Sequence, residues 1–389
     1  MSITIEVGST QLEDIERACA EAGRAAAREA MVGICRRLEA SRSSRARRAR
    51  HGRCRTILTR VGYITISRGR SRRPDGTRHF PLDDRLGLAP HHEAPPWVRR
   101  RGCHLAAEHP YREAARLLSS DVGAPVDHRA IWRWVQAEGD ARLKARAERV
   151  NAMFIDGEAP PEPPTPIPQA LTVAADATGI RLIEGGGTVK VAVAFTASKQ
   201  VGTTLKRRLV DKMVFADVAE VDDFGRSLAY GLEARYGAHR IPRLMLLGDG
   251  EPWIAGLGTD WLPGARYQCD WWHVGAKVKE FCRTDLARHS RWRRRAFRSP
   301  LRLAKDLRAG RHHGDPEHAR LLAAYLEANA AHLYTFRSMG PGHWLRGSGP
   351  VEKHVELTVN RRFKRRGMRW SRGGARRLLA IRLEVIASR

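Results

Sequence analysis

The sequence has few cysteines, and none are spaced as in a small metal-binding or disulfide-rich domain. Six cysteines are scattered along the chain, and no two form a C-x-x-C pair. This spacing argues against a zinc ribbon and against a secreted disulfide framework. A long apolar run and the apolar core of a signal peptide are also missing. We therefore expect no membrane partner and a cytoplasmic location.

Acidic residues are scarce beside basic ones. The 389-residue chain has 70 Lys and Arg against 42 Asp and Glu, a net charge of +28. Such an excess favours a polyanionic partner, because each phosphate that a protein neutralises releases counterions and strengthens binding. The alternative is a basic surface that serves only solubility. The hydrophobic fraction of 42% is enough for a core, and the length predicts two or three domains.

The amino-terminal half is predicted to be mostly helical with a small β unit. Residues 1–55 combine a helix over 12–40, broken near Gly23, with a basic arm, and residues 56–100 alternate as β-strands do. Residues 101–157 contain two helical patterns separated by Gly123, typical of a helix-turn-helix. A Pro-rich stretch, 158–168, is predicted to be an extended linker to the second half.

The helix-turn-helix pattern predicts a DNA-reading face. Asp127 is placed to cap the second helix, and Ile131 and Val135 fall on its inner side. This leaves four side chains free to contact DNA, as in a recognition helix: His128, Arg129, Trp132 and Arg133. An ordinary hairpin of two packed helices is the alternative.

Aspartates follow or interrupt apolar strands in the second half. Asp176 follows the strand pattern 171–175, Asp249 lies between two glycines after the pattern 243–247, and Asp270 follows the pattern 267–269. Strands that alternate with helices predict an α/β domain, which we place at 169–274. Each aspartate alone is also explained as a turn former. Four others compete for the role of Asp176: Asp156, Asp217, Asp222 and Asp223.

The residues after this domain are predicted to form helices. The interval 275–345 has apolar residues at helical spacing, and its segment 288–298 is rich in Arg. We expect Arg293, Arg294 and Arg295 to contact phosphate while Trp292 and Phe297 stack on unpaired bases. The alternative is a cationic helix face with its aromatic residues buried.

The segment 346–389 closes the second half. Val351, Val355, Val359 and Phe363 form an apolar stripe, and Glu352 lies at its edge. From Arg361 to Arg377 there are nine Lys or Arg and no Asp or Glu. We expect DNA contacts here from Arg361, Arg362, Lys364, Arg365 and Arg366. Glu356, one turn beyond Glu352, is the alternative carboxylate.

Three carboxylates in one cleft would call for divalent cations. Asp176, Asp249 and Glu352 would repel one another and raise each other's pKa without a cation between them. Mg²⁺ binds a few carboxylates and completes its shell with water and phosphate oxygens. A pair of such ions promotes in-line displacement at phosphorus.

The second half also resembles the DDE transposases of bacterial insertion sequences, within the IS-Kra and IS-Lre type groups. The resemblance lies in LLGDGEPWI at 246–254, CDWWHV at 269–274 and the block from 347 to 382, together with PLDDRLGL at 81–88 and the helix-turn-helix. It implies an RNase H-like catalytic domain with a helical insertion before the last carboxylate. It also implies metal binding by Asp176, Asp249 and Glu352, with Mg²⁺ as cofactor and Mn²⁺ as a substitute.

The resemblance implies further site residues and partners. Asp270-x-x-His273 is similar to the family's (C/D)-x-x-H motif, so that His273 would contact a scissile phosphate or position a carboxylate. The partners would be terminal inverted repeats and target DNA, with a homo-oligomer at synapsis and a nucleoid-associated location. DNA cleavage and strand transfer are thus the expected activity. Two rivals stay open: an RNase H-like nuclease without strand transfer, and a non-catalytic helix-turn-helix regulator.

Overall fold

The computed structural model describes residues 11–41, 53–90, 93–160, 162–163, 166–201, 207–282, 286–333 and 347–387, together with residues 5 and 8. The chain divides into two compact units, Met1–Glu138 and Gly139–Arg389. This boundary falls inside a helix, α5 (His128–Phe154), and not in the Pro-rich stretch. In the described ranges no helix is both long and apolar enough to cross a membrane.

The first unit opens with a long helix and a small β unit. The helix α1 (Leu12–Ala40) is unbroken, so the predicted break near Gly23 is wrong. The surrounding Ala, Glu and Arg residues are strong helix formers and outweigh the cost of one glycine, about 1 kcal/mol. The hairpin β1 (Arg53–Thr59) and β2 (Gly62–Arg68) is followed by β3 (Ser71–Arg72), β4 (Arg78–His79) and α2 (Pro81–Arg85). The predicted β unit is therefore confirmed, whereas most of the predicted basic arm lies outside the described residues.

Three helices complete the first unit: α3 (Pro96–Glu108), α4 (Tyr111–Val122) and the start of α5. The helix α4 ends at Gly123, whose φ of 65° is the left-handed conformation that glycine adopts without strain. Asp127 accepts a hydrogen bond from the backbone N–H of Arg129 at 2.7 Å, and Ile131 and Val135 are fully buried. The predicted helix pair is thus present.

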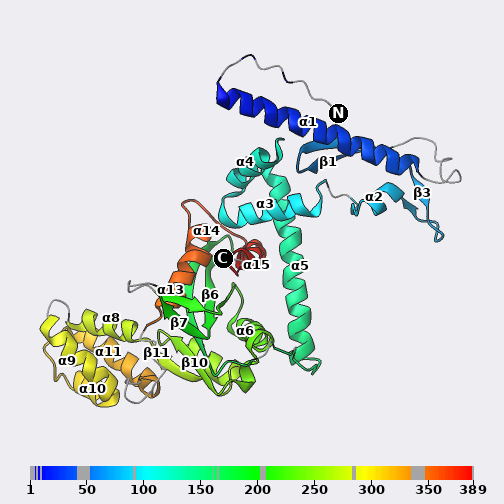
Figure 1. Ribbon diagram of the computed structural model, residues 1–389. Coiled ribbons are helices and arrows are strands. Elements are labelled where there is room, and N and C mark those ends of the chain that lie inside the picture. Colours follow the sequence, from blue (N-terminus) through cyan, green and yellow to red (C-terminus); the bar gives the residue numbers. More distant parts are fainter. Residues whose placement is uncertain are drawn as a thin grey trace. The chain divides into compact units, whose positions relative to one another are not determined.

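A mixed five-stranded sheet forms the centre of the second unit (Figure 1), with the strand order β11-β10-β5-β6-β9. Its strands are β5 (Ala170–Leu182), β6 (Gly185–Phe195), β9 (Met213–Asp217), β10 (Arg243–Gly248) and β11 (Arg266–Cys269). The strands β5, β6 and β9 are antiparallel neighbours, whereas β10 runs parallel to both β5 and β11. The predicted α/β class is confirmed, although β9 and the small hairpin β7 (Ala197–Gln200) and β8 (Arg207–Val210) had no clear sequence signal.

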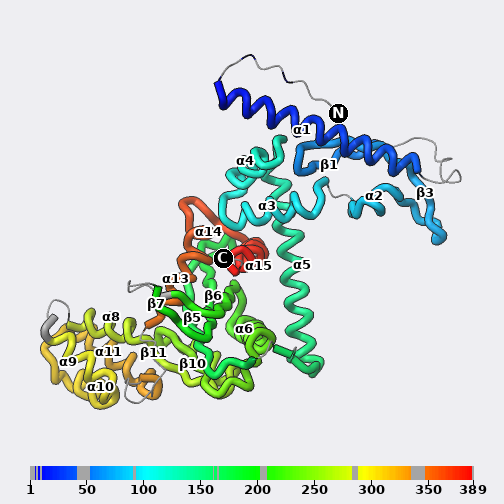
Figure 2. Tube along the Cα trace, viewed as in Figure 1, coloured from blue at the N-terminus to red at the C-terminus, as the bar shows by residue number. Residues whose placement is uncertain are grey.

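Helices cover this sheet. On one side α6 (Val221–Tyr236) buries Phe224, Leu228 and Leu232 in a core shared with the strands. The helix α7 (Pro252–Gly256) and the π-helical turn η3 (Leu257–Trp261) follow β10. Figure 2 shows the carboxyl-terminal segment returning to the sheet, where α13 (Gly349–Val355) packs on β5 and β6. The last helix, α15 (Arg372–Ala387), packs on β9.

The segment predicted to be helical, 275–345, is helical over most of its described residues, although its first helix already begins at Trp271. It consists of α8 (Trp271–Cys282), α9 (Leu286–Arg298), α10 (Pro300–Arg308), α11 (Pro316–Asn329) and a short 3-10 turn, η4 (Ala330–His332). The helices α8 and α9 pack together, as do α10 and α11, around buried Phe281, Leu303 and Leu326. Residues 283–285 and 334–346 of the predicted insertion lie outside the described ranges.

The apolar stripe of the closing segment is buried as predicted, at positions Val351, Val355, Val359 and Phe363. On a regular helix, residues four apart drift by about 40° per step, because each residue turns about 100°. The helix α13 passes into a π-helical turn, η5 (Glu356–Asn360), before α14 (Arg361–Phe363). A π-helical turn has more residues per turn, so it offsets this drift and keeps the stripe on one face.

Arg382, on α15, stabilises that π-helical turn. Its Nε donates to the carbonyl oxygen of Thr358 at 2.7 Å, and its Nη2 donates to the carbonyl oxygen of Leu357. The Arg382 side chain is buried, so these carbonyl groups receive donors where water cannot reach them easily.

Candidate active site

Three aspartates lie in one row at the carboxyl edge of the parallel strands. Leu247 of β10 pairs with Ala174 of β5, so Asp249 and Asp176 each lie two residues beyond this pair. Gly248 of β10 pairs with Cys269 of β11, which places Asp249 and Asp270 one residue beyond. Because parallel strands end at the same edge, all three side chains belong to one region of the sheet. Asp176 differs from the prediction in one respect, since β5 continues through it to Leu182.

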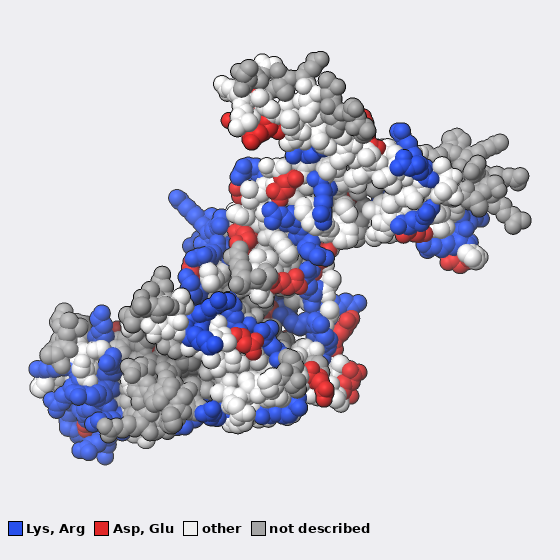
Figure 3. Space-filling model, viewed as in Figure 1, with Lys and Arg blue, Asp and Glu red and all other residues white. Residues whose placement is uncertain are grey.

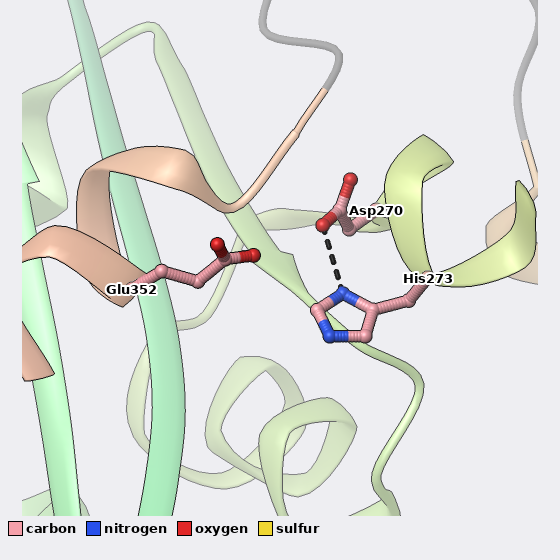
Figure 4. A group of neighbouring side chains, drawn as sticks. All are labelled: Asp270, His273 and Glu352. Atoms are coloured by element: carbon pink, nitrogen blue, oxygen red, sulfur yellow. Dashed lines mark hydrogen bonds and ion pairs between the residues drawn. The ribbon is translucent and has the colours of Figure 1, made fainter. Parts of the chain in front are cut away.

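The helix α13 brings Glu352 to this edge (Figure 4). Ligand atoms of Asp270, His273 and Glu352 lie within 4.8 Å of one another. Asp270 immediately precedes α8 and accepts a hydrogen bond from the Trp272 N–H at 2.7 Å, as a helix cap does. Its second oxygen accepts from His273 Nδ1 at 2.9 Å. One carboxylate therefore caps the helix and orients the imidazole ring.

Ser348 connects Asp270 with Glu352. Its hydroxyl oxygen lies 2.6 Å from Asp270 Oδ2 and 2.8 Å from Glu352 Oε1. Ser348 stands at the cap position of α13, but its side chain makes no cap hydrogen bond to that helix. A hydroxyl carries one hydrogen and can donate to only one of the two carboxylates at a time. Acceptor atoms therefore outnumber donors at this point.

The pKa shifts show that the side chains interact electrostatically. Burial raises the pKa of Asp176, and the negative charges of Asp249 and Glu352 raise it further. The hydrogen bond to Asp270 raises the pKa of His273, with added contributions from Asp249 and Glu352. Burial alone would raise the pKa of Asp270, but hydrogen bonds from His273, Ser348 and the Trp272 N–H together lower it. The surrounding carboxylates thus favour the protonated form of His273.

The aspartates considered as alternatives to Asp176 lie in different environments. Asp217 is buried between two arginines: Arg376 donates to it at 2.8 and 3.1 Å, and Arg146 donates to Oδ2. Asp156, Asp222 and Asp223 are exposed. Glu356, the alternative to Glu352, pairs with Arg361 at 3.4 Å. Of these carboxylates, Asp176 interacts electrostatically with Asp249 and His273, and Glu352 interacts with Asp176 and His273.

Part of the carboxyl-terminal basic run lies beside the site. Lys364 Nζ donates to the hydroxyl of Thr178, which lies two residues beyond Asp176 on β5 and hence on the same face. Arg361, Lys364, Arg365 and Arg366 are exposed. The prediction that Arg362 belongs to this surface is wrong, because its side chain is fully buried with the guanidinium 4.9 Å from the centre of the Trp370 ring.

The arginines of α9 form a second cationic surface. Figure 3 shows Lys and Arg side chains gathered over α9 and α10. Arg293 and Arg294 are exposed as predicted, whereas Arg295 pairs with Asp306 and is partly buried. The expected stacking aromatics are also partly or fully buried, with Trp292 against Phe281 and Phe297 against Trp271. The prediction that Trp292 and Phe297 stack on bases is therefore wrong for this conformation.

The predicted DNA-reading residues of α5 are accessible. Trp132 is 50% exposed, an unusual fraction for a tryptophan in a packed helix pair. Arg129 and Arg133 are exposed and His128 is partly exposed, with Arg133 lying 3.7 Å from Glu93. These side chains lie outside the core of the first unit, whereas Ile131 and Val135 of the same helix are buried in it.

Asp270 was predicted in part, and Ser348 was not predicted. Asp270 was expected directly after a strand and as part of the D-x-x-H pattern, but its link to Glu352 was not foreseen. Ser348 has no comparable signal, because serine is common before helices for capping alone.

The fold and the site together define an α/β protein with an acidic cluster at the carboxyl edge of a mixed sheet. The chain belongs to UPF0236, described as an uncharacterised protein family, whose model matches residues 9–310. The match includes Asp176, Asp249, Asp270 and His273, whereas Glu352 lies beyond it. None of the curated proteins compared with the chain matches it.

Proposed function

We propose that this protein is a transposase that cleaves and joins DNA strands with Asp176, Asp249 and Glu352, on an RNase H-like domain. The supporting observation is the row of Asp176, Asp249 and Asp270 across three neighbouring strands, with Glu352 delivered from α13. The net charge of +28 and the cationic side chain of Lys364 beside β5 fit a DNA substrate. A helix-turn-helix in the first unit fits recognition of terminal repeats.

The residues present fit a divalent cation. Carboxylate oxygens are the ligands that Mg²⁺ prefers, and Mn²⁺ accepts the same set. The excess of acceptors around Ser348 and the rise in the Asp176 pKa caused by burial and by the charges of Asp249 and Glu352 both favour an added positive charge. Asp176, Asp249 and Glu352 would hold Mg²⁺, which supplies activation of the attacking oxygen and stabilisation of the leaving oxygen.

The other residues would orient these groups and the substrate. Asp270 holds His273 through Nδ1 and leaves the opposite ring nitrogen free of that bond. A protonated His273 can then donate from this nitrogen to a phosphate oxygen of the scissile group. Ser348 restrains Glu352 through the contact at 2.8 Å. In strand joining, a DNA 3′-oxygen forms the new bond to phosphorus while the bond to the leaving oxygen breaks.

An assay with labelled DNA tests this proposal. Linear DNA carrying the sequences that flank the coding region, incubated with protein and Mg²⁺, should yield both cleaved ends and ends joined to a second DNA. Cleavage without joining would favour the nuclease alternative, and binding without any cleavage would favour the regulator. Chelation of the metal with EDTA should stop both reactions and leave DNA binding in place.

The basic segment beside the site should strengthen DNA binding by neutralising phosphates. Changing Lys364, Arg365 and Arg366 together to Ala should reduce the slope of log affinity against log salt by about 0.9 for each phosphate that is no longer neutralised. Fluorescence anisotropy over a series of salt concentrations measures this slope. A matched triple variant at Arg240, Arg243 and Arg266, at the opposite end of β10 and β11, should keep the wild-type slope. Equal slopes for both triple variants would place the basic segment outside the DNA interface.

A further inference from the structure

A buried polar network lies directly behind the backbone of Asp249. The hydroxyl of Tyr325 donates to the carbonyl oxygen of Asp249 at 3.0 Å. The next residue, Gly250, donates its N–H to the hydroxyl of Tyr267 at 3.1 Å. Asn329 links Tyr325 to Cys269: its Nδ2 donates to the Tyr325 carbonyl at 3.0 Å, and its Oδ1 accepts from the Cys269 thiol at 3.2 Å. The single peptide group that joins Asp249 to Gly250 is thereby held at its carbonyl oxygen and at its N–H by two tyrosine hydroxyl groups.

The network is closely packed. Gly250 has a φ of +98°, and a Cβ atom there would lie 2.7 Å from the Tyr325 ring and 3.1 Å from Asn329 Nδ2. Tyr267, Cys269 and Asn329 are buried, and Tyr325 is partly buried. Burial raises the pKa of both tyrosines, and that of Cys269 to about 12, so their donor hydrogens stay in place at neutral pH. The turn at Asp249 has little room to shift while these contacts persist.

The partners come from two different parts of the second unit. Tyr267 and Cys269 belong to β11 in the sheet, whereas Tyr325 and Asn329 belong to α11 in the helical segment. Tyr325 also lies beneath Lys277 of α8, whose Nζ is 5.0 Å from the ring centre. The helical segment thus reaches the Asp249 turn through the Tyr325 side chain.

We infer that Tyr325 is a positioning residue: its hydroxyl fixes the Asp249 carbonyl, so that the helical segment sets the orientation of the Asp249 carboxylate. The side chain of Asp249 accepts one local hydrogen bond, from the Glu251 N–H at 2.9 Å. Its direction therefore depends on the backbone of the turn. The effect expected on DNA cleavage rests on the proposed function. The effect expected on cation binding does not rest on it.

The variant Tyr325→Phe tests the inference. It keeps the ring that packs against Gly250 and removes the one hydroxyl. The Mn²⁺ concentration for half-maximal binding, followed as free Mn²⁺ by electron paramagnetic resonance, should rise about fivefold, the effect of removing one hydrogen bond of ordinary strength. Cleavage should show the same shift in its Mn²⁺ dependence, with a maximal rate close to wild type at saturating Mn²⁺. The control Tyr230→Phe, on α6, should change neither quantity.

The outcomes separate the inference from the proposed function. If wild type cleaves DNA but Tyr325→Phe has an unchanged Mn²⁺ dependence, the inference fails and the function stands. If wild type binds Mn²⁺ without cleaving DNA and the variant binds it more weakly, the function fails and the inference stands. A wild type that neither binds Mn²⁺ nor cleaves overturns both. A variant that only melts at a lower temperature, with unaltered Mn²⁺ binding, shows a structural role and overturns the inference.

Discussion

Replacing Asp249 with Asn should abolish strand cleavage and joining while DNA-end binding stays within about twofold of wild type. The expected loss of rate is roughly a thousandfold, the size seen when one preorganised group that stabilises transition-state charge is removed. Asn keeps the size of Asp249 and an oxygen that can accept from the Glu251 N–H, so the turn should persist. The change removes mainly one negative charge from the row formed with Asp176 and Asp270. Gel assays of cleavage and joining, together with anisotropy for binding, measure both quantities.

Matched variants make this result specific to the site. Glu352→Gln should have an equally large effect on cleavage, because it removes the negative charge. The Gln side chain keeps an acceptor for Ser348, so the local contact should persist. Asp222→Asn, at an exposed aspartate in the first turn of α6, should cleave like wild type. Full cleavage by Asp249→Asn would falsify the assignment of this row as the active site.

Replacing Asp217 with Asn should destabilise the second unit strongly. The Asp217 side chain is only 3% exposed, and it neutralises Arg146 and Arg376, which are 20% and 36% exposed. Breaking a buried ion pair from one side leaves uncompensated charge, and we expect a loss of about 3 kcal/mol in the free energy of unfolding. This is the lower end of the usual range, because both arginines keep some contact with water.

Urea denaturation followed by tryptophan fluorescence measures this loss. Asp222→Asn, at an exposed residue close to the start of α6, is the control and should unfold as wild type does. The stabilising role of Asp217 also distinguishes it from Asp176: its variant should be unstable, whereas Asp176→Asn should be stable but inactive. Similar stabilities for Asp217→Asn and wild type would contradict the ion-pair account.

Local patterns were sufficient to predict most elements of the second unit. Apolar runs gave β10 and β11 to within one residue, and periodicity gave the helical segment at 275–345. These elements are determined by residues close together in sequence. The strand β9 was missed because its apolar run is short, and because it pairs with β6 across an interval that contains β7 and β8.

The candidate site was predicted less completely, because its contacts depend on tertiary packing. A run of basic residues normally lies at the surface, so Arg362 was expected there. Its burial depends on Trp370, whose indole N–H donates to the Phe363 carbonyl at 3.1 Å and folds the run back on itself. The link from Asp270 to Glu352 passes through Ser348, which lies 78 positions from Asp270 in sequence, and no local pattern reports such a contact.

The buried Arg382 has a consequence for judging which gene copies of such a protein are functional. A copy truncated shortly after Arg366 would retain Asp176, Asp249, His273 and Glu352, so a motif search would score it as intact. It would nevertheless lack the donors to the Leu357 and Thr358 carbonyls, in the helix that carries Glu352. To distinguish a frameshifted copy from a functional one, it is therefore as informative to check that the last helix is intact as to check that the carboxylates are present.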